Sequence, residues 1–258
     1  MTTSKKNTNS NTKNKGLLSR IWRVTKRVFL ILFILQFVYI ILLKWINPPI
    51  TITQLGSLLG GDGLHRTYVG MNNISPNAKL AVICTEDQLF PDHDGFDFKN
   101  IEKALKHNQK SKSLHGASTI SQQVAKNVFL WQGRNWLRKG LEVYFTFMIE
   151  LVWGKKRILE MYLNVAEMGK GIYGIEAASR AYYHIPAKNL SRLQAARIAA
   201  CLPNPKIYTV KPLSERVATR SAWALDQMNH LETDPDIQKL LEQSSDKSTQ
   251  DTHDKSSK

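Results

Sequence analysis

The sequence predicts a mostly α-helical protein in which one membrane-spanning helix precedes a helical domain. From about residue 76 to residue 231, apolar residues recur at helical spacing, without the sustained apolar–polar alternation of half-buried strands. Residues 28–43 contain no charged side chain. A helix of that length spans roughly 24 Å, close to the hydrocarbon thickness of a bilayer.

Residues 28–46 are expected to form the transmembrane anchor. Arg27 and Lys44 can extend their charged ends to the lipid headgroups, and a tryptophan follows at the interface. A cleaved signal peptide is the alternative, but the residues after Lys44 offer no small-residue cleavage site. Residues 1–27 carry eight Lys or Arg residues and no acidic residue, so we expect a basic cytoplasmic tail and the rest of the chain outside the cytoplasm.

Composition divides the remaining chain into three parts. Residues 47–75 contain clusters of Pro and Gly and are expected to form a linker. Residues 76–231 form the predicted helical domain, and the polar residues 232–258 are expected to be a disordered tail. Within the domain, the apolar spacing predicts helices over residues 76–89, 98–110, 119–128, 134–153, 155–164, 171–183, 188–202 and 213–231.

The first three of these helices begin at recognisable signals. Pro76 suits a first helical turn, where no backbone N–H is needed. Asp97 and Ser118 carry side chains that can cap the second and third helices. Cys84 and Cys201 lie in apolar helical patterns and are expected to be buried thiols rather than a disulfide or a metal site.

The positive charge of the chain indicates an anionic partner. The formal net charge is +15, and residues 28–231 carry a net +10. Nucleic acid, anionic lipid and a phosphorylated substrate all fit such a surface, and basicity that serves solubility alone is the simpler alternative. Nucleic acid is the least expected partner, because the anchor places the basic domain outside the cytoplasm.

An acidic pair, Glu86 and Asp87, interrupts the apolar run of the first predicted domain helix. A carboxylate at the edge of an apolar wall tends to have a raised pKa, which suits a general acid or base near neutral pH. Alternatively, the pair caps a neighbouring helix or forms ion pairs with Lys or Arg. The segment alone does not separate these two interpretations.

Two later helices offer polar and cationic faces. Thr119, Gln122, Gln123 and Lys126 share one face of the third helix, which suits sugar hydroxyls and phosphate oxygens, although an ordinary solvated face has the same pattern. The fourth helix begins with the cluster Arg134, Arg138, Lys139 and Glu142. A single salt bridge is the simpler interpretation. Two separated carboxylates beside cations also suit sugar transfer from a diphosphate, in which one carboxylate takes the acceptor proton and the cations stabilise the leaving group.

Taken in order, these segments resemble the motifs of the family-51 glycosyltransferases, the peptidoglycan transglycosylases. Residues 86–95 are similar to the first motif, Glu-Asp-x-x-Phe-x-x-His-x-Gly. The second, third and fourth motifs are matched by residues 116–127, 138–142 and 156–164. Departures are small: Gln194 stands where the family usually has Glu, and Tyr183 where Phe is common.

The resemblance implies a lysozyme-like helical domain of two lobes, with an apolar jaw that faces the membrane. It implies an inverting enzyme of the bacterial cytoplasmic (inner) membrane that polymerises lipid II into β-1,4 glycan strands and releases undecaprenyl diphosphate. No Lys-Thr-Gly motif of a transpeptidase occurs, so a monofunctional enzyme is expected. The expected partners are lipid II, the growing glycan strand, the membrane and other cell-wall synthesis and division proteins, with no nucleic acid.

The resemblance also implies roles for individual residues. Glu86 would be the general base, and Glu142 would support the cationic cluster or hold a divalent metal such as Mg or Mn; no organic cofactor is expected. The expected substrate-binding residues are Asp87, Phe90, His93, Ser118, Thr119, Gln123, Lys126, Arg134, Arg138 and Lys139. The alternatives are a lysozyme-like muramidase or lytic transglycosylase, which shares the helical architecture but cleaves glycan, and a non-catalytic scaffold of wall synthesis.

Overall fold

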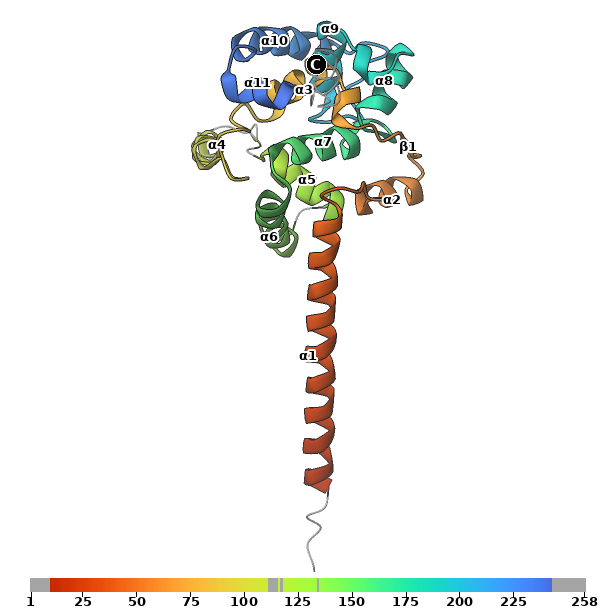
Figure 1. Ribbon diagram of the computed structural model, residues 1–258, viewed down its shortest axis with the longest axis vertical. Coiled ribbons are helices and arrows are strands. Elements are labelled where there is room, and N and C mark those ends of the chain that lie inside the picture. The colour runs from red at the N-terminus through yellow and green to blue at the C-terminus, as the bar shows by residue number, and fades with distance from the viewer. Residues whose placement is uncertain (1–9, 111–115, 117, 134, 243–258) are drawn as a thin grey trace, which may run out of the picture. The chain divides into compact units, whose positions relative to one another are not determined.

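A computed structural model describes residues 10–110, 116, 118–133 and 135–242 (Figure 1). It confirms the predicted mostly α-helical class. The chain forms two compact units, Met1–Ile46 and Asn47–Lys258, and each is described by itself.

The first unit is one long helix, α1 (Ser10–Leu42). Its segment Ser19–Leu42 is long and apolar enough to span a membrane. The helix extends into the part expected as a basic tail, because an established helix adds a hydrogen bond for each further residue at little cost. It ends four residues before the expected end of the anchor at residue 46.

The second unit contains two groups of helices (Figure 1). In one group, α3 packs against α9, α10 and α11; in the other, α5 packs against α2, α6 and α7. The bounds are α2 (Ile52–Leu59), α3 (Pro76–Glu86), α4 (Phe98–Lys110), α5 (Ile120–Phe129), α6 (Trp136–Trp153), α7 (Lys155–Val165), α8 (Ile175–Tyr183), α9 (Arg192–Cys201), α10 (Glu215–Leu231) and α11 (Pro235–Leu241).

Helix α3 lies at the centre of the first group. Every residue from Ala78 to Cys84 is buried, because α9 and α10 cover it from different sides. The run includes Lys79, whose ammonium donates a hydrogen bond to the carbonyl of Leu241 at 3.3 Å. Burial lowers the pKa of Lys79. This bond fastens α11 to α3, so the prediction of disorder is wrong for residues 235–241, while residues 243–258 lie outside the described part.

The segment 47–75 is not the extended linker that its Pro and Gly content predicts. Thr51 caps α2 in a reciprocal capping box with Gln54. Strand β1 (His65–Arg66) then pairs in parallel with β3 (Ile172–Tyr173), which pairs with β2 (Glu167–Gly169) in an antiparallel arrangement. A 3-10 turn follows at Met71–Asn73. Backbone pairing to a distant strand therefore holds this segment on the domain, where composition alone suggests only turns.

Several helix boundaries differ from the predictions for local reasons. Asp97 caps α4 as expected, since its carboxylate accepts a bond from the N–H of Asn100 at 2.9 Å. Thr119, not Ser118, caps α5, and Asn135 caps α6. The helix predicted from residue 171 begins only at Ile175, because β2 and β3 occupy the preceding residues. A 3-10 turn (Ala187–Asn189) likewise precedes α9.

The turn between β2 and β3 requires a glycine at position 171, and this requirement can be tested. Gly171 has φ +69°, and a Cβ there would lie 2.2 Å from the carbonyl oxygen of Asp62. We predict that Gly171→Ala lowers the free energy of unfolding by about 2 kcal/mol, measured by urea denaturation. Gly70→Ala is the matched control, because Gly70 has φ −69° and a Cβ there would meet nothing within 4 Å. Equal stability of the two variants would contradict the requirement.

Candidate active site

Glu86 is the last residue of α3, and its two carboxylate oxygens have different surroundings. The side chain is only 12% exposed. Its Oε2 accepts a hydrogen bond from Nε2 of Gln123 at 3.0 Å. Its Oε1 is buried and accepts no hydrogen bond from the described residues, although Nη2 of Arg220 lies 3.7 Å away. One oxygen is therefore held in place while the other remains able to accept a proton.

Burial raises the pKa of Glu86 above its ordinary value. The hydrogen bond from Gln123 and the charge of Arg220 oppose this rise, and the neighbouring Asp87 adds to it. A buried carboxylate with a raised pKa is a stronger base than an exposed one, which suits proton abstraction near neutral pH.

Gln123 is itself oriented by a tyrosine. The hydroxyl of Tyr162 donates to Oε1 of Gln123 at 3.3 Å, which leaves the amide Nε2 to face Glu86. Tyr162 is fully buried, and burial raises its pKa well above the ordinary value, so the hydroxyl stays protonated as a donor. The bond from Tyr162 therefore orients the hydrogen-bond partner of the candidate base.

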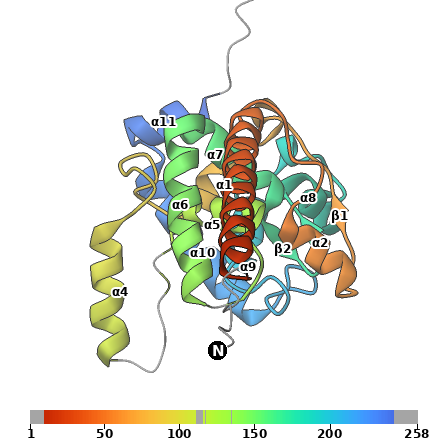
Figure 2. The same ribbon diagram turned by 90° about the horizontal axis from the view of Figure 1, so that it is seen from below.

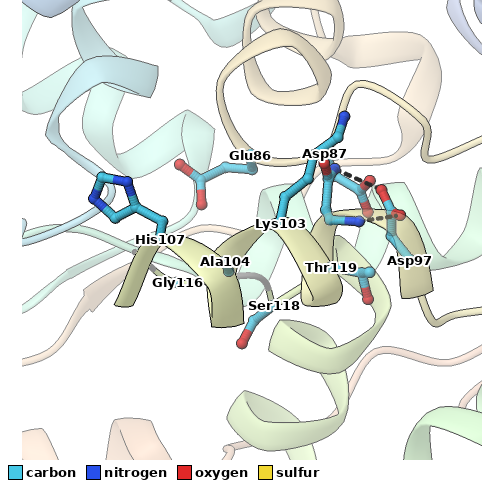
Figure 3. A pocket seen from close by; sticks show the side chains of 10 residues that line it. Glu86, Asp87, Asp97, Lys103, Ala104, His107, Gly116, Ser118 and Thr119 are labelled. Carbon is cyan, nitrogen blue, oxygen red and sulfur yellow. Dashed lines mark hydrogen bonds between the residues drawn. The ribbon is translucent and has the colours of Figure 1, made fainter. Parts of the chain in front are cut away.

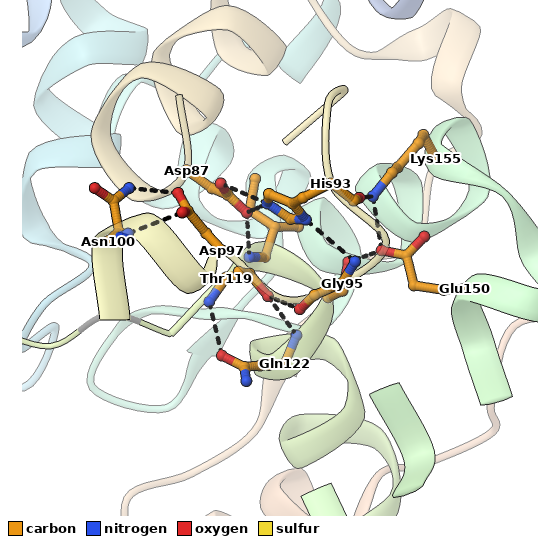
Figure 4. Close-up of polar contacts among 11 residues, drawn as sticks. Asp87, His93, Gly95, Asp97, Asn100, Thr119, Gln122, Glu150 and Lys155 are labelled. Atoms are coloured by element: carbon orange, nitrogen blue, oxygen red, sulfur yellow. Dashed lines mark hydrogen bonds and ion pairs between the residues drawn. The ribbon is translucent and has the colours of Figure 1, made fainter. Parts of the chain in front are cut away.

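Asp87 has a different role from its neighbour. Its carboxylate accepts a hydrogen bond from the backbone N–H of Ile120 at 2.9 Å, in the first turn of α5 (Figure 4). It also lies 3.0 and 3.1 Å from Nε2 of His93. Nδ1 of His93 accepts from the N–H of Gly95, so the ring proton is assigned to Nε2, which donates to Asp87. Asp87 therefore ties the end of α3 to the start of α5.

The loop after Asp87 closes tightly against α6. Gly95 has φ +85°, and a Cβ there would lie 2.7 Å from Cγ2 of Thr146 and 2.9 Å from Cγ of Glu150. Its carbonyl accepts a bond from the hydroxyl of Thr119 at 2.7 Å. The glycine of the first motif is thus required by a close approach, and the hydroxyl of Thr119 is already used within the protein.

Phe90 and Lys155 complete the support of this loop. Phe90, one of the expected substrate-binding residues, is fully buried, so its ring packs behind the loop. The ammonium of Lys155 lies 4.7 Å from the centre of that ring and donates to the carbonyl of His93. Lys155 also pairs with Glu150 at 2.7 Å, and Glu150 accepts from Ser121 of α5 (Figure 4).

The first turns of α6 carry the cationic cluster. Nη1 of Arg138 lies 2.6 Å from Oε2 of Glu142, and Nζ of Lys139 lies 2.5 Å from Oε1. Arg138 and Glu142 are nearly buried, whereas Lys139 is 42% exposed. Lys126 reaches the same pocket from α5, and burial lowers its pKa. Three basic side chains beside one carboxylate give this pocket a composition that suits an anion; Arg134, expected here too, lies outside the described residues.

Glu142 does not fit the divalent metal expected as one option. Both of its oxygens already accept bonds from cations, which would repel a metal ion. Within residues 10–110, 116, 118–133 and 135–242, no group of three or more His, Cys, Asp or Glu side chains is arranged to hold a metal. Glu142 instead fits the other expected role, support of the cationic cluster through Arg138 and Lys139.

Two pockets lie near Glu86, which lines the first itself and is hydrogen-bonded to Gln123 of the second. One is lined by Glu86, Asp87 and Thr119 together with Lys103 and His107 of α4, and Figure 3 shows the Glu86 carboxylate within it. The other is the anionic-ligand pocket just described, which Gln123 also lines; Ser118 lines both. The structure thus brings residues of the first two motifs together at Glu86, and residues of the second and third motifs together in the cationic pocket.

Several residues around Glu86 were missed in the sequence. Arg220 approaches it from α10 and donates to the carbonyl of Thr85 at 3.0 Å. Gln132 lines the cationic pocket, and Lys103 the pocket of Figure 3. Arg220 lies in a helix with ordinary polar spacing, so no local signal singles it out. Gln132 and Lys103 are likewise placed only by the tertiary fold.

Comparison with known proteins identifies the family of the chain. The Transglycosylase family matches residues 52–229, which include every described site residue. A biosynthetic peptidoglycan transglycosylase of Haemophilus influenzae is 49% identical over 217 residues, covering 81% of this chain and 88% of its own. Proteins of the same name from Mannheimia succiniciproducens and Escherichia coli are 56% and 54% identical, covering 64% and 67% of this chain and 67% and 72% of their own. The chain therefore belongs to the transglycosylase family.

Proposed function

We propose that this protein is a peptidoglycan glycosyltransferase that polymerises lipid II into β-1,4 glycan strands and releases undecaprenyl diphosphate. One observation carries the mechanism: the base candidate Glu86 keeps one buried oxygen without a hydrogen bond from the described residues, beside a pocket built for an anion. A proton acceptor near a site for an anion is what transfer from a diphosphate donor requires.

In the proposed reaction, Oε1 of Glu86 takes the proton of the acceptor's 4-hydroxyl. The resulting oxygen attacks the anomeric carbon of the growing strand while the bond from that carbon to the diphosphate breaks. Lys126, Arg138 and Lys139 stabilise the negative charge that develops on the leaving diphosphate. Attack from the face opposite the leaving group converts the α-linked donor into a β-linked product.

Glu142 acts through its neighbours in this scheme. Its carboxylate holds Arg138 and Lys139 at the edge of the pocket, so their charges are in place before the donor arrives. Asp87 and His93 hold the loop beside Glu86 rather than contact the reacting atoms. Magnesium or manganese bound at Glu142 has no place in this arrangement.

The cationic pocket also favours synthesis over the two alternatives. A muramidase or lytic transglycosylase acts on glycan without a diphosphate and has no use for three clustered cations. A scaffold has no need of a buried carboxylate with a raised pKa. We further propose an inner-membrane enzyme with its N-terminus in the cytoplasm, supported by the basic residues before the apolar helix. Other wall-synthesis and division proteins are its expected partners.

We predict that Glu86→Gln lowers the polymerisation rate about 100-fold or more, because an amide cannot take the acceptor proton. Labelled lipid II in vesicles is the substrate, and glycan chains are measured by gel electrophoresis. Circular dichroism should show an unchanged fold. Polymerisation at the unchanged rate would remove Glu86 from the role of base, and degradation of glycan without synthesis would support the lytic alternative.

The pH dependence should report the surroundings of Glu86. The base must be ionised, so kcat/KM should rise with pH through its raised pKa. Gln123→Ala removes a donor that stabilises the ionised form, so the pKa should rise further and the acidic limb should move to higher pH. Gln227→Ala is the control, because this variant also loses a glutamine side chain, but one that bonds Gln88 instead of Glu86. It should leave the acidic limb in place. A shift to lower pH in Gln123→Ala would contradict the assignment.

Arg138→Met should lower the polymerisation rate about 100-fold, because one donor to the developing charge is lost. Lys106→Met, an exposed change outside the pocket that breaks only a surface pair with Glu102, should leave the rate near that of the unchanged protein. Thermal unfolding of both variants separates lost folding from lost catalysis. Equal rates in a folded Arg138→Met protein would place the diphosphate elsewhere.

A further inference from the structure

Helix α2 has its polar and apolar sides reversed. Its polar residues Thr53, Gln54 and Ser57 are buried, with exposed fractions of 7%, 0% and 5%. Its large apolar residues are the exposed ones: Ile52, Leu55, Leu58 and Leu59 are 47%, 42%, 50% and 79% exposed. Single exposed leucines are common on protein surfaces, but a short helix that exposes its apolar residues while burying its polar ones needs a partner.

The buried side of α2 cannot turn outward, because its polar groups bond the domain. Ser57 donates to the carbonyl of Gly63 at 2.9 Å, and Gln132 donates to the hydroxyl of Thr53 at 2.9 Å. Oε1 of Gln54 accepts from Arg66 at 3.2 Å. These bonds fix the rotation of α2, so its leucines remain on the surface of the second unit.

Helix α6 also exposes a row of apolar side chains on the same side of the second unit. Val143, Phe147 and Leu151 are exposed one turn apart, while its buried residues are both polar and apolar: Arg138, Glu142, Thr146, Met148, Ile149 and Trp153. Figures 1 and 2 both place α2 and α6 on either side of α5, and in Figure 1 the helices α9 and α10 lie on the opposite side of the unit. The two apolar faces therefore flank the helix that carries Lys126.

The short connection between α1 and α2 limits how far α2 can lie from a membrane that α1 spans. The apolar segment of α1 ends at Leu42, and α2 begins at Ile52. Ten residues span at most about 35 Å even when fully extended. A bilayer that is spanned by α1 is therefore within reach of α2. Helix α2 itself carries no charged residue that would oppose insertion. No soluble partner is fixed to the chain in this way.

We propose that α2 is a lipid-contacting helix that lies in the bilayer interface with Leu55, Leu58 and Leu59 toward the acyl chains. The membrane-facing jaw expected from the family accounts for the apolar face of α6; α2 adds a separate contact on the other side of α5. Thr53 of α2 and Lys126 line one pocket. Seating α2 in the interface would thus place that pocket at the level of lipid headgroups.

The test places a fluorescent label on α2 of the full chain. Leu58→Cys is labelled with the dye NBD and reconstituted into vesicles of phosphatidylethanolamine and phosphatidylglycerol, with or without spin-labelled lipid. Burial raises the pKa of the natural thiols Cys84 and Cys201 to about 12, so they should stay unlabelled. Leu193→Cys is the matched control, since Leu193 is a 42% exposed leucine on α9.

We expect the dye at position 58 to emit at shorter wavelength than the dye at position 193. Spin-labelled lipid should quench the fluorescence at position 58, whereas iodide in the aqueous phase should not. Iodide quenching equal to that at position 193 would overturn the proposal. A shift to shorter wavelength without lipid quenching, together with cross-linking of two copies through position 58, would instead assign the face to self-association. If Leu58→Cys fails to fold, Leu59→Cys offers the more exposed site. The label reports contact without turnover, so its result is separate from that of the lipid II assay.

Discussion

The buried carboxylate of Asp87 holds the end of α3 against the start of α5, and the geometry of the site depends on this tie. Glu86 precedes it on α3, and Gln123, which orients Glu86, follows on α5. A carboxylate is a strong acceptor for the unpaired N–H groups at the start of a helix, and the positive end of the helix dipole stabilises its charge. His93 supplies the second donor. Without the hydrogen bond from Ile120 to Asp87, the position of Glu86 on α3 relative to Gln123 on α5 would be less well fixed.

Burial acts on the two ends of the site in opposite directions. It raises the pKa of Glu86 and lowers that of Lys126, so in both cases it favours the neutral form. An arriving diphosphate would favour the charged form of Lys126 and compensate the repulsion from Arg138 and Lys139. The clustered cations are thus electrostatically unfavourable by themselves, and the charge of the proposed donor would relieve their repulsion. Glu142 limits this cost by pairing with two of the cations.

Much of the site could be predicted because its residues lie in local patterns. The apolar spacing around Glu86, the polar face of α5 and the cationic start of α6 are each readable within about a dozen residues. Arg220 and Gln132 could not be predicted, since only the tertiary fold brings them to the pocket. The role of Asp87 as a helix-to-helix tie was one of two alternatives, and choosing between them required the position of Ile120.

The fold errors have a similar origin. Composition marked 47–75 as a linker, but β1 gains its structure from a partner strand more than a hundred residues away. The tail prediction failed at 235–241 for the same reason: its three buried apolar residues pack against α3 and its neighbours. Short elements stabilised by distant partners carry little periodicity of their own.

The outward apolar faces of α2 and α6 have a practical consequence for handling this protein. Deleting α1 removes the longest apolar segment, but the leucines of α2 and the Trp136, Phe147 and Leu151 side chains of α6 remain on the surface. Such a truncated form would still present two apolar patches, which favour aggregation in plain buffer. We therefore expect the catalytic domain to benefit from detergent or lipid, including in crystallisation screens, after the anchor has been cut away.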